Sequence, residues 1–155
     1  VLVSSAGACQ RGQPGPVPSP RELGAGALPE GSTQRGLDVV YTGRTRPDCT
    51  ELIALTPDGT AHHRPVCGDD DPVPLVEEPQ LWADDTSGDY AHRGDRLWVR
   101  TVAWDAITEE FVISEWELEI CATGLFDVPP AGSQRVPFEF EVAAGAGPPS
   151  ETPCR

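Results

Sequence analysis

The sequence predicts an all-β protein, an antiparallel β-sandwich or barrel of about seven strands that is stapled by disulfides. Several short segments alternate apolar and polar residues, which is the period of a half-buried strand. Turn residues separate these segments, and no longer stretch carries the apolar stripe of a helix. We divide the chain into an extended Pro/Gly-rich arm or linker at 1–36, a β-domain at 37–143 and a disulfide-tied C-terminal tail at 144–155.

The arm has proline at every second position over part of its length. Pro14, Pro16, Pro18 and Pro20 favour an extended, polyproline-like backbone, and glycines then loosen the chain as far as Gly36. Such a segment is either a spacer or a peptide that docks in the cleft of another protein, and we expect docking. The expected partner-binding residues of the arm are Pro14, Pro16, Val17, Pro18, Pro20 and Leu23.

The expected strands follow one another with short polar connections. Alternation is clearest in VPFEFEV, where Phe138, Phe140 and Val142 would face inward and the two glutamates outward. The acidic stretch GDDDP at 68–72 is expected to be a loop. In chain order, the expected strands cover 37–43, 50–56, 60–66, 81–85, 96–104, 111–121 and 136–142.

A tight turn sets the register of the first hairpin. The Pro-Asp-Gly sequence at 57–59 has the chemistry of a type I turn closed by a bulge. Counting outward from this turn brings Cys49 opposite Cys67 at a non-hydrogen-bonded position, where Cα atoms lie about 4.5 Å apart. The register therefore predicts a Cys49–Cys67 disulfide. Pro65 would fall where its missing N–H points away from the partner strand, which predicts a sheet edge.

The five cysteines leave one thiol outside two bridges. Besides Cys49–Cys67, we expect Cys121 to bond Cys154, which would pin the tail to the β-domain and leave Cys9 as the odd residue. A Cys9–Cys154 bridge, which would tie the two ends of the chain together, is the alternative. Two bridges imply an oxidising compartment.

The segments 96–104 and 111–121 predict a second, longer hairpin in which Trp104 opposes Phe111. One face carries core pairs, and the other begins polar but ends apolar. An exposed apolar end would bind a partner; the alternative is that a loop or the N-terminal segment covers it. The core pairs would be Leu97–Leu118, Val99–Trp116 and Ala103–Val112. The candidate partner-binding residues are Val102, Trp104, Phe111 and Ile113, beyond the pairs Trp98–Glu117 and Arg100–Glu115.

Charge and composition exclude several classes of partner. The chain has 25 acidic against 11 basic residues, and its net charge of -14 repels nucleic-acid phosphates and anionic lipid headgroups. Lys, Asn and Met are absent, which indicates a GC-rich genome such as that of an actinomycete. No stretch is apolar over the roughly 18 residues that span a membrane. We therefore expect a secreted protein with protein partners.

A membrane association is expected only if Cys9 is lipidated. Ala6-Gly7-Ala8 fits the pattern that precedes a signal-peptide cleavage site, and with Cys9 it resembles a bacterial lipobox. Ala6 stands where a lipobox prefers Leu, which departs from the pattern. Lipidated, the chain would be a surface lipoprotein with a spacer after Cys9.

The sequence contains no motif of a catalytic or metal site. His62 and His63 are adjacent on a strand, so their side chains would point to opposite faces and not share one ion. HExxH, GxSxG and P-loop patterns are missing, and the cysteines lack zinc spacing. The aspartates at 69–71, 84–85 and 89 offer oxygens to calcium but lack the EF-hand spacing. We expect no enzyme activity, no metal and no cofactor.

The layout of CQRGQPGPVPSPRELGAG ahead of an acidic β-domain resembles that of the small adaptor subunit in the umbrella-type secreted toxin particles of actinomycetes. In that family, the adaptor links a repeat-bearing toxin to a lectin- or protease-like subunit. The resemblance covers layout, carries over no binding residue, and implies an adaptor within an extracellular hetero-oligomeric complex. We expect a non-enzymatic module that bridges other subunits, with its arm in a partner cleft. The alternatives are the surface lipoprotein and a secreted inhibitor or small enzyme.

Overall fold

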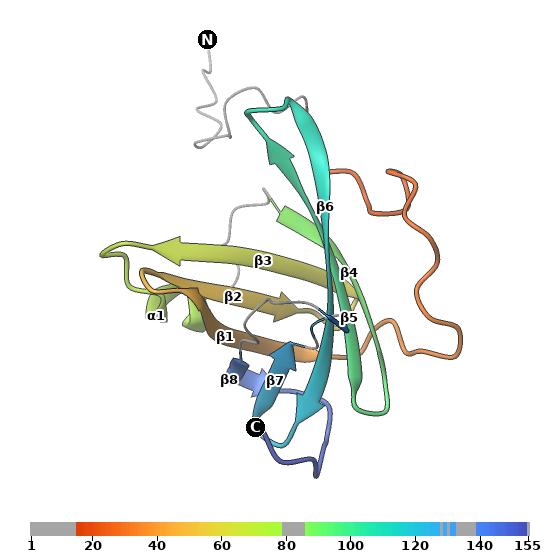
Figure 1. The fold of residues 1–155 in the computed structure, drawn as a ribbon, viewed down its shortest axis with the longest axis vertical. Coiled ribbons are helices and arrows are strands. Elements are labelled where there is room, and N and C mark those ends of the chain that lie inside the picture. The colour runs from red at the N-terminus through yellow and green to blue at the C-terminus, as the bar shows by residue number, and fades with distance from the viewer. Residues whose placement is uncertain (1–14, 79–85, 128, 130, 133–138, 155) are drawn as a thin grey trace.

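The chain forms a closed antiparallel barrel in which each strand pairs with the next and the last pairs with the first (Figure 1). The computed structural model describes residues 15–78, 86–127, 129, 131–132 and 139–154. The expected all-β class is confirmed. The elements are β1 (Asp38–Arg46), β2 (Cys49–Leu55), β3 (Thr60–Cys67), α1 (Val73–Glu77), β4 (Thr86–Arg93), β5 (Arg96–Asp105), β6 (Glu110–Cys121), β7 (Gly124–Asp127) and β8 (Glu139–Ala146).

The first hairpin has the register that its turn predicts. The Thr56 N–H donates to the Thr60 carbonyl at 2.9 Å, and Gly59 takes the left-handed φ of 96° that the turn requires. Cys49 pairs with Cys67 in the β2–β3 ladder, with their Cα atoms 4.1 Å apart, and the two are bonded. The predicted Cys49–Cys67 disulfide is therefore confirmed.

β3 and β4 are joined over a short seam. Their ladder holds the pair Ala61↔Gly88 and one further pair, so the rest of β3 has no strand beside it there among the described residues. Pro65 lies in that stretch, as its missing N–H led us to expect. No alternation indicated β4, because its residues are mostly polar. Gly88 is required there, since a Cβ would lie 1.7 Å from the carbonyl oxygen of Arg100.

β5 and β6 pair without a break in the predicted register, with Trp104 opposite Phe111. β7 pairs with β6 only at 118–121, so the distal half of the hairpin extends past the barrel (Figure 1). This corrects one expectation, because Val112 was assigned to the core face but is 45% exposed. Val112 does lie on the predicted face of the hairpin, but β7 does not reach that far along β6, so the barrel does not cover this residue. The barrel-side pair Leu97–Leu118 is fully buried, as expected.

The last strands differ from the prediction at their limits. The strand expected at 136–142 is described from Glu139 as β8, and Phe138 and the strand expected at 81–85 lie outside the described residues. Phe140 is buried as predicted, whereas Val142 is 37% exposed. Val142 pairs with Tyr41 beside a break in the β1–β8 register, at the rim of the barrel. The four residues of β7 were too few to show alternation.

Apolar clusters lie on both faces of the strands. Inside the barrel, the cluster comprises Leu37, Val39, Tyr41, Ile53, Leu55, Ala61, Tyr90, Leu97, Val99, Leu118, Ile120, Leu125 and Phe140. On the outside of β1–β3, a second cluster comprises Val40, Leu52, Ala54 and Val66, covered by Leu75 and Val76 of α1 and by Ala144. The near-continuous apolar run of β2 is explained by burial on both faces.

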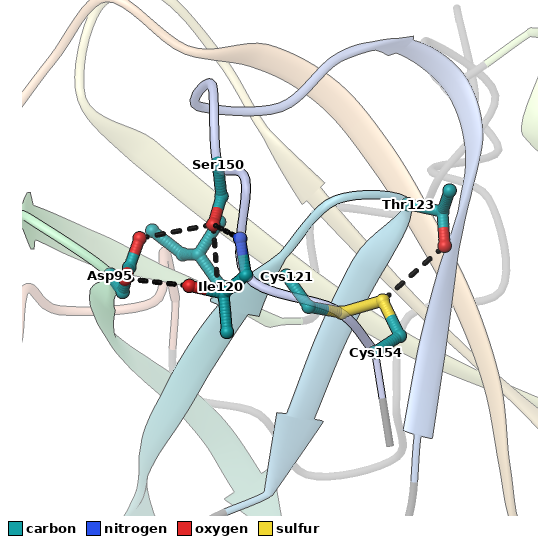
Figure 2. Close-up of a disulfide and its surroundings, with 7 residues drawn as sticks. Asp95, Ile120, Cys121, Thr123, Ser150 and Cys154 are labelled. Carbon is teal, nitrogen blue, oxygen red and sulfur yellow. Dashed lines mark hydrogen bonds between the residues drawn. A yellow bond between two sulfur atoms is a disulfide. The ribbon is translucent and has the colours of Figure 1, made fainter.

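The C-terminal tail is held against the end of the barrel (Figure 2). Cys121 is bonded to Cys154, which confirms the expected pairing and excludes the Cys9–Cys154 alternative. The Ser150 hydroxyl donates to the Asp95 carboxylate at 3.0 Å and to a backbone carbonyl of β6. Two disulfides indicate an environment that is not reducing.

We predict that Tyr90→Phe lowers the free energy of unfolding by about 1–3 kcal/mol. The buried Tyr90 hydroxyl accepts the Leu37 N–H at 2.9 Å and donates to the Thr56 carbonyl at 2.8 Å, so its loss leaves the Leu37 N–H unpaired and removes one of the two hydrogen bonds to the Thr56 carbonyl. Urea denaturation measures the change. Tyr41→Phe is the control, since that hydroxyl makes no hydrogen bond within the described part of the chain, and an equal loss in both variants would contradict the prediction.

We also predict that stability falls as the pH rises above about 10. Burial raises the pKa of both Tyr41 and Tyr90. In that range the two phenols ionise in the unfolded chain but stay protonated in the folded barrel, so the unfolded state gains relative free energy. Urea midpoints measured from neutral to alkaline pH check this. The Tyr41→Phe/Tyr90→Phe double variant should show a shallower decline, and identical slopes would count against the explanation.

Candidate protein-binding surface

The β5–β6 loop presents an apolar residue at its outermost point. The Asp105 carboxylate accepts the N–H groups of Ile107 at 2.8 Å and of Thr108 at 3.3 Å, and these bonds lower the pKa of Asp105. Glu109 takes the left-handed φ of 57° that brings the chain back into β6. The loop is therefore well defined, yet it leaves the Ile107 side chain 94% exposed.

The strands behind this loop are apolar on both faces. The rings of Trp104 and Phe111 pack edge to face with centroids 5.0 Å apart, and Ile113 is half-buried beside them. Val112 is exposed on the other face. Val102, which we had included among the partner-binding residues, is fully buried on the face that it shares with Ile113, so this face is covered at that position and Val102 offers no area to a partner.

We call these residues the distal surface: Trp104, Ile107, Phe111, Val112 and Ile113. Trp104 Nε1 is buried and has no hydrogen-bond partner among the described residues. The exposed apolar area of the distal surface lies at Ile107 and Val112, and such area favours contact with another molecule.

The proximal half of the same hairpin forms the floor of a groove. A cavity of about 870 Å³ lies over the side chains of Trp98, Arg100, Glu115 and Glu117, and the arm at 27–29 forms one wall. Its remaining lining comes from β5–β6 and from the chain after β7: Arg96, Val99, Trp116, Asp127, Pro129 and Ala131. The volume is within the range of ligand pockets, and the floor mixes aromatic rings with carboxylates.

The arm is held against the barrel by arginines. Arg100 is 5% exposed, bonds both oxygens of the Asp89 carboxylate at 2.8 and 2.7 Å, and donates to the Gly26 carbonyl at 2.5 Å. The hydrogen bond to Asp89 raises the pKa of Arg100, so the charge is permanent. Arg93 donates to the Glu30 carbonyl at 2.6 Å. The arm between residues 26 and 33 is thus part of the folded structure.

The predicted partner-binding residues of the arm lie before this anchored stretch. Pro20 is buried, Val17 and Pro18 are half-buried, Pro16 is exposed, Leu23 is 37% exposed, and Pro14 lies outside the described residues. Because Gly26 is bonded to Arg100, the arm lies against the outer face of β5 at that residue. The arm and the hairpin, which were predicted as separate contact regions, meet on one side of the barrel.

The two adjacent histidines point to opposite faces, as the strand geometry predicts. His63 lies inside the barrel, where its Nε2 is 2.5 Å from a Glu51 oxygen and its ring packs on Trp116 at 4.7 Å. His62 contacts the Thr86 carbonyl through Nδ1 at 3.2 Å. Within the described residues, no group of three or more His, Cys, Asp and Glu side chains is placed to hold a metal ion. The described part of the chain also contains no helix of the length and apolarity needed to cross a membrane.

Sequence reasoning found the distal surface only in part. Its strand residues followed from the register, but Ile107 was missed because loop residues have no alternation to read. An isoleucine within a polar turn was the available signal. The Arg100–Asp89 pair was also missed, since β4 was not recognised. Comparison of the chain with protein-family models, curated proteins and solved structures finds no match.

We predict that Arg100→Ala destabilises the protein by about 2–4 kcal/mol and releases the arm. The substitution leaves the Asp89 carboxylate unpaired in a site where its side chain is 26% exposed, and it removes the bond to Gly26. Urea denaturation measures stability, and the rate of tryptic cleavage at Arg21 measures release.

The matched control for this prediction is Arg96→Ala. Its pair with Glu117 is exposed, at 42% and 52%, so we expect a change within about 0.5 kcal/mol and unchanged cleavage at Arg21. Equal cleavage rates in the Arg100→Ala and wild-type proteins would show that Arg100 does not hold the arm.

Proposed function

We propose that the protein is a secreted, non-enzymatic adaptor module that binds other proteins mainly through the distal surface of its long hairpin. The observation that supports this most directly is the 94% exposure of Ile107, at the end of a hairpin whose strands are apolar on both faces. A chain that binds no partner gains nothing from such a surface, which promotes aggregation.

The energetics favour a compact contact. Burying an aliphatic side chain such as Ile107 contributes about 1.5–3 kcal/mol, and aromatic residues such as Trp104 commonly dominate the affinity of an interface. The unbroken ladder between β5 and β6 orders these side chains before a partner arrives. Little conformational entropy is then lost on binding.

The arm supplies a second contact in this proposal. Residues 26–33 are held by the barrel, and the chain at 19–25 forms a hydrogen-bonded turn that leaves Leu23 exposed. Pro16, which is also exposed, and Leu23 are the arm residues that a partner cleft would hold. Two contact elements on one module suit a bridge between subunits. Secretion is supported by the two disulfides and by the strongly acidic surface, which keeps an extracellular protein soluble.

We predict that a photo-crosslinking amino acid at Ile107 captures a defined secreted protein, whereas the same amino acid at Asp70 does not. Asp70 is an exposed loop position outside the proposed surface. The proteins are incubated with the culture supernatant of the producing organism, and crosslinked bands are identified by mass spectrometry. The same bands from both positions, or none from Ile107, would contradict the proposal.

With the captured partner in hand, Ile107→Asp should weaken binding by about tenfold to a hundredfold, the equivalent of the lost aliphatic burial. The matched control is Thr108→Asp, which adds the same charge to the neighbouring loop position but keeps the isoleucine. Binding measured by calorimetry should be close to wild type for this control. An equal loss in both variants would assign the effect to charge and not to the apolar contact.

A further inference from the structure

Among the described residues, the edge of β6 that faces away from β5 is paired over only part of its length. β5 pairs with β6 on one side along the length of the hairpin, but on the other side β7 reaches only 118–121. Within the described residues, no strand lies against the remaining edge at 111–117. Natural proteins usually protect such an edge with proline, lysine, a bulge or a covering segment. The edge at 111–117 contains no proline or lysine, and its φ angles include no positive value.

One contact shows which residues of β6 point their backbone N–H and C=O groups toward β5 and which point them outward. Ile120 donates its N–H to the Asp95 carbonyl at 2.6 Å, so even-numbered residues of β6 point their backbone groups toward β5. The odd-numbered residues therefore point theirs outward. Their side chains lie on the outer face of the hairpin, while the even-numbered side chains lie on the inner face. The outward-pointing residues are Phe111, Ile113, Glu115 and Glu117.

The side chains beside this edge define a pattern of charge and polarity. Glu115 and Glu117 are exposed on the outer face, and Glu115 lies opposite Arg100 in the ladder and interacts with its charge at a distance. Glu117 pairs with Arg96 in an exposed contact. Such pairs contribute little free energy, so a basic side chain of a partner can take the place of Arg96. On the inner face, the neighbours are the apolar Val112 and Trp116. A strand placed here would thus meet carboxylates on one face and apolar groups on the other.

The cavity over Trp98 lies at the barrel end of the same edge. Glu115, Trp116 and Glu117 all contribute to its lining, together with the arm and with Asp127, Pro129 and Ala131 at the end of β7 and just after it. Side chains of an added strand would therefore enter a preformed space of about 870 Å³. The lining holds the carboxylates of Glu115, Glu117 and Asp127 against the guanidinium groups of Arg96 and Arg100. Because Arg100 is already neutralised by Asp89, the balance within a chain of net charge -14 favours cationic side chains in that space.

We infer that the edge of β6 at 111–117 binds an extended peptide segment of a partner protein by strand addition, and that this segment alternates basic and apolar residues. This inference rests on the proposed protein-binding function and gives the partner's chemistry. The basic side chains lie against Glu115 and Glu117, and the apolar side chains lie against Val112 and Trp116. Backbone hydrogen bonds to the odd-numbered residues supply affinity for any extended peptide, and the charges of the glutamates select peptides with basic side chains.

A second copy of this chain does not fit the same edge. Edge-to-edge pairing of two β6 strands would place glutamates of one copy beside glutamates of the other, and like charges across a ladder are destabilising. The net charge of -14 on each copy adds to the repulsion. The glutamates thus act against self-association while leaving the edge open to a basic strand.

The test uses the full chain and a synthetic peptide of alternating Arg and Val, with a peptide of alternating Glu and Val as the control. Amide hydrogen exchange is measured by NMR with and without each peptide. The Arg-Val peptide should slow exchange at Phe111, Ile113, Glu115 and Glu117, and raised salt should weaken its binding. No protection by the Arg-Val peptide, or equal protection by the Glu-Val peptide, would overturn the inference.

A pair of variants at one position isolates the backbone contribution. Glu115→Gln and Glu115→Pro both remove the charge, but only proline also removes the outward N–H, and neither takes a hydrogen bond from the β5–β6 ladder. We expect the proline variant to bind the Arg-Val peptide about fivefold to tenfold more weakly than the glutamine variant. Equal affinities would exclude strand addition. Amide exchange in the wild-type protein keeps the test valid if the proline variant is unstable.

The inference and the proposed function fail separately. Ile107→Asp removes the distal contact but leaves the edge at 111–117 intact, so this variant should still bind the Arg-Val peptide. If Ile107 crosslinks a partner but the peptide does not bind, the edge inference is wrong and the binding function stands. If the peptide protects the edge but Ile107 captures nothing, the edge inference stands and the role of the distal surface is wrong.

Discussion

The continuous pairing of β5 with β6 is the interaction on which the rest of the structure depends. β4 pairs with β5 along almost the whole of this ladder, from Arg93↔Arg96 to Thr86↔Ala103, whereas β7 pairs with β6 at 118–121, in the barrel half. The distal half continues in the same register after β7 has ended, so the hairpin leaves the barrel as an ordered projection (Figure 1). The distal surface and the open edge both result from this difference in strand length.

Arg100 lies where the wall of the barrel becomes the projecting hairpin. Its guanidinium is neutralised by Asp89 of the neighbouring strand, and its remaining donor holds the arm at Gly26. A buried arginine with three such bonds is expensive to disrupt, because each partner would be left unpaired. The arm therefore forms a wall of the groove at 27–29, and of the expected contact residues before it, Pro16 and Leu23 are exposed whereas Pro20 is buried.

The covalent staples lie away from the proposed contacts. Cys121 is the last residue of β6, at the opposite end of that strand from the loop that carries Ile107. Its bond to Cys154 and the contact between Ser150 and Asp95 secure the tail at that end (Figure 2). The result is a barrel stapled at one end with its apolar hairpin free at the other, which is a suitable arrangement for a module that must hold its shape while it binds.

Local chemistry in the sequence was sufficient for several long-range features. The Pro-Asp-Gly turn determined the register of β2 and β3, and that register placed Cys49 opposite Cys67. The pairing of Trp104 with Phe111 likewise followed from alternation in two long strands. These predictions succeeded because a hairpin register depends on the turn and on the period of the side chains, and both are local properties.

Tertiary structure alone decided the closure of the barrel, the burial of each hairpin face and the position of the arm. β4 and β7 carry little alternation, since one is polar and the other has four residues, so barrel closure was not visible in the chain. The burial of Val102 and the exposure of Val112 depend on where the hairpin leaves the barrel, and the position of the arm depends on Arg100 meeting Asp89. The sequence by itself determined which residues pair within each hairpin. Only the packing of the hairpins against one another decided which faces are covered, because coverage depends on residues that lie far apart along the chain.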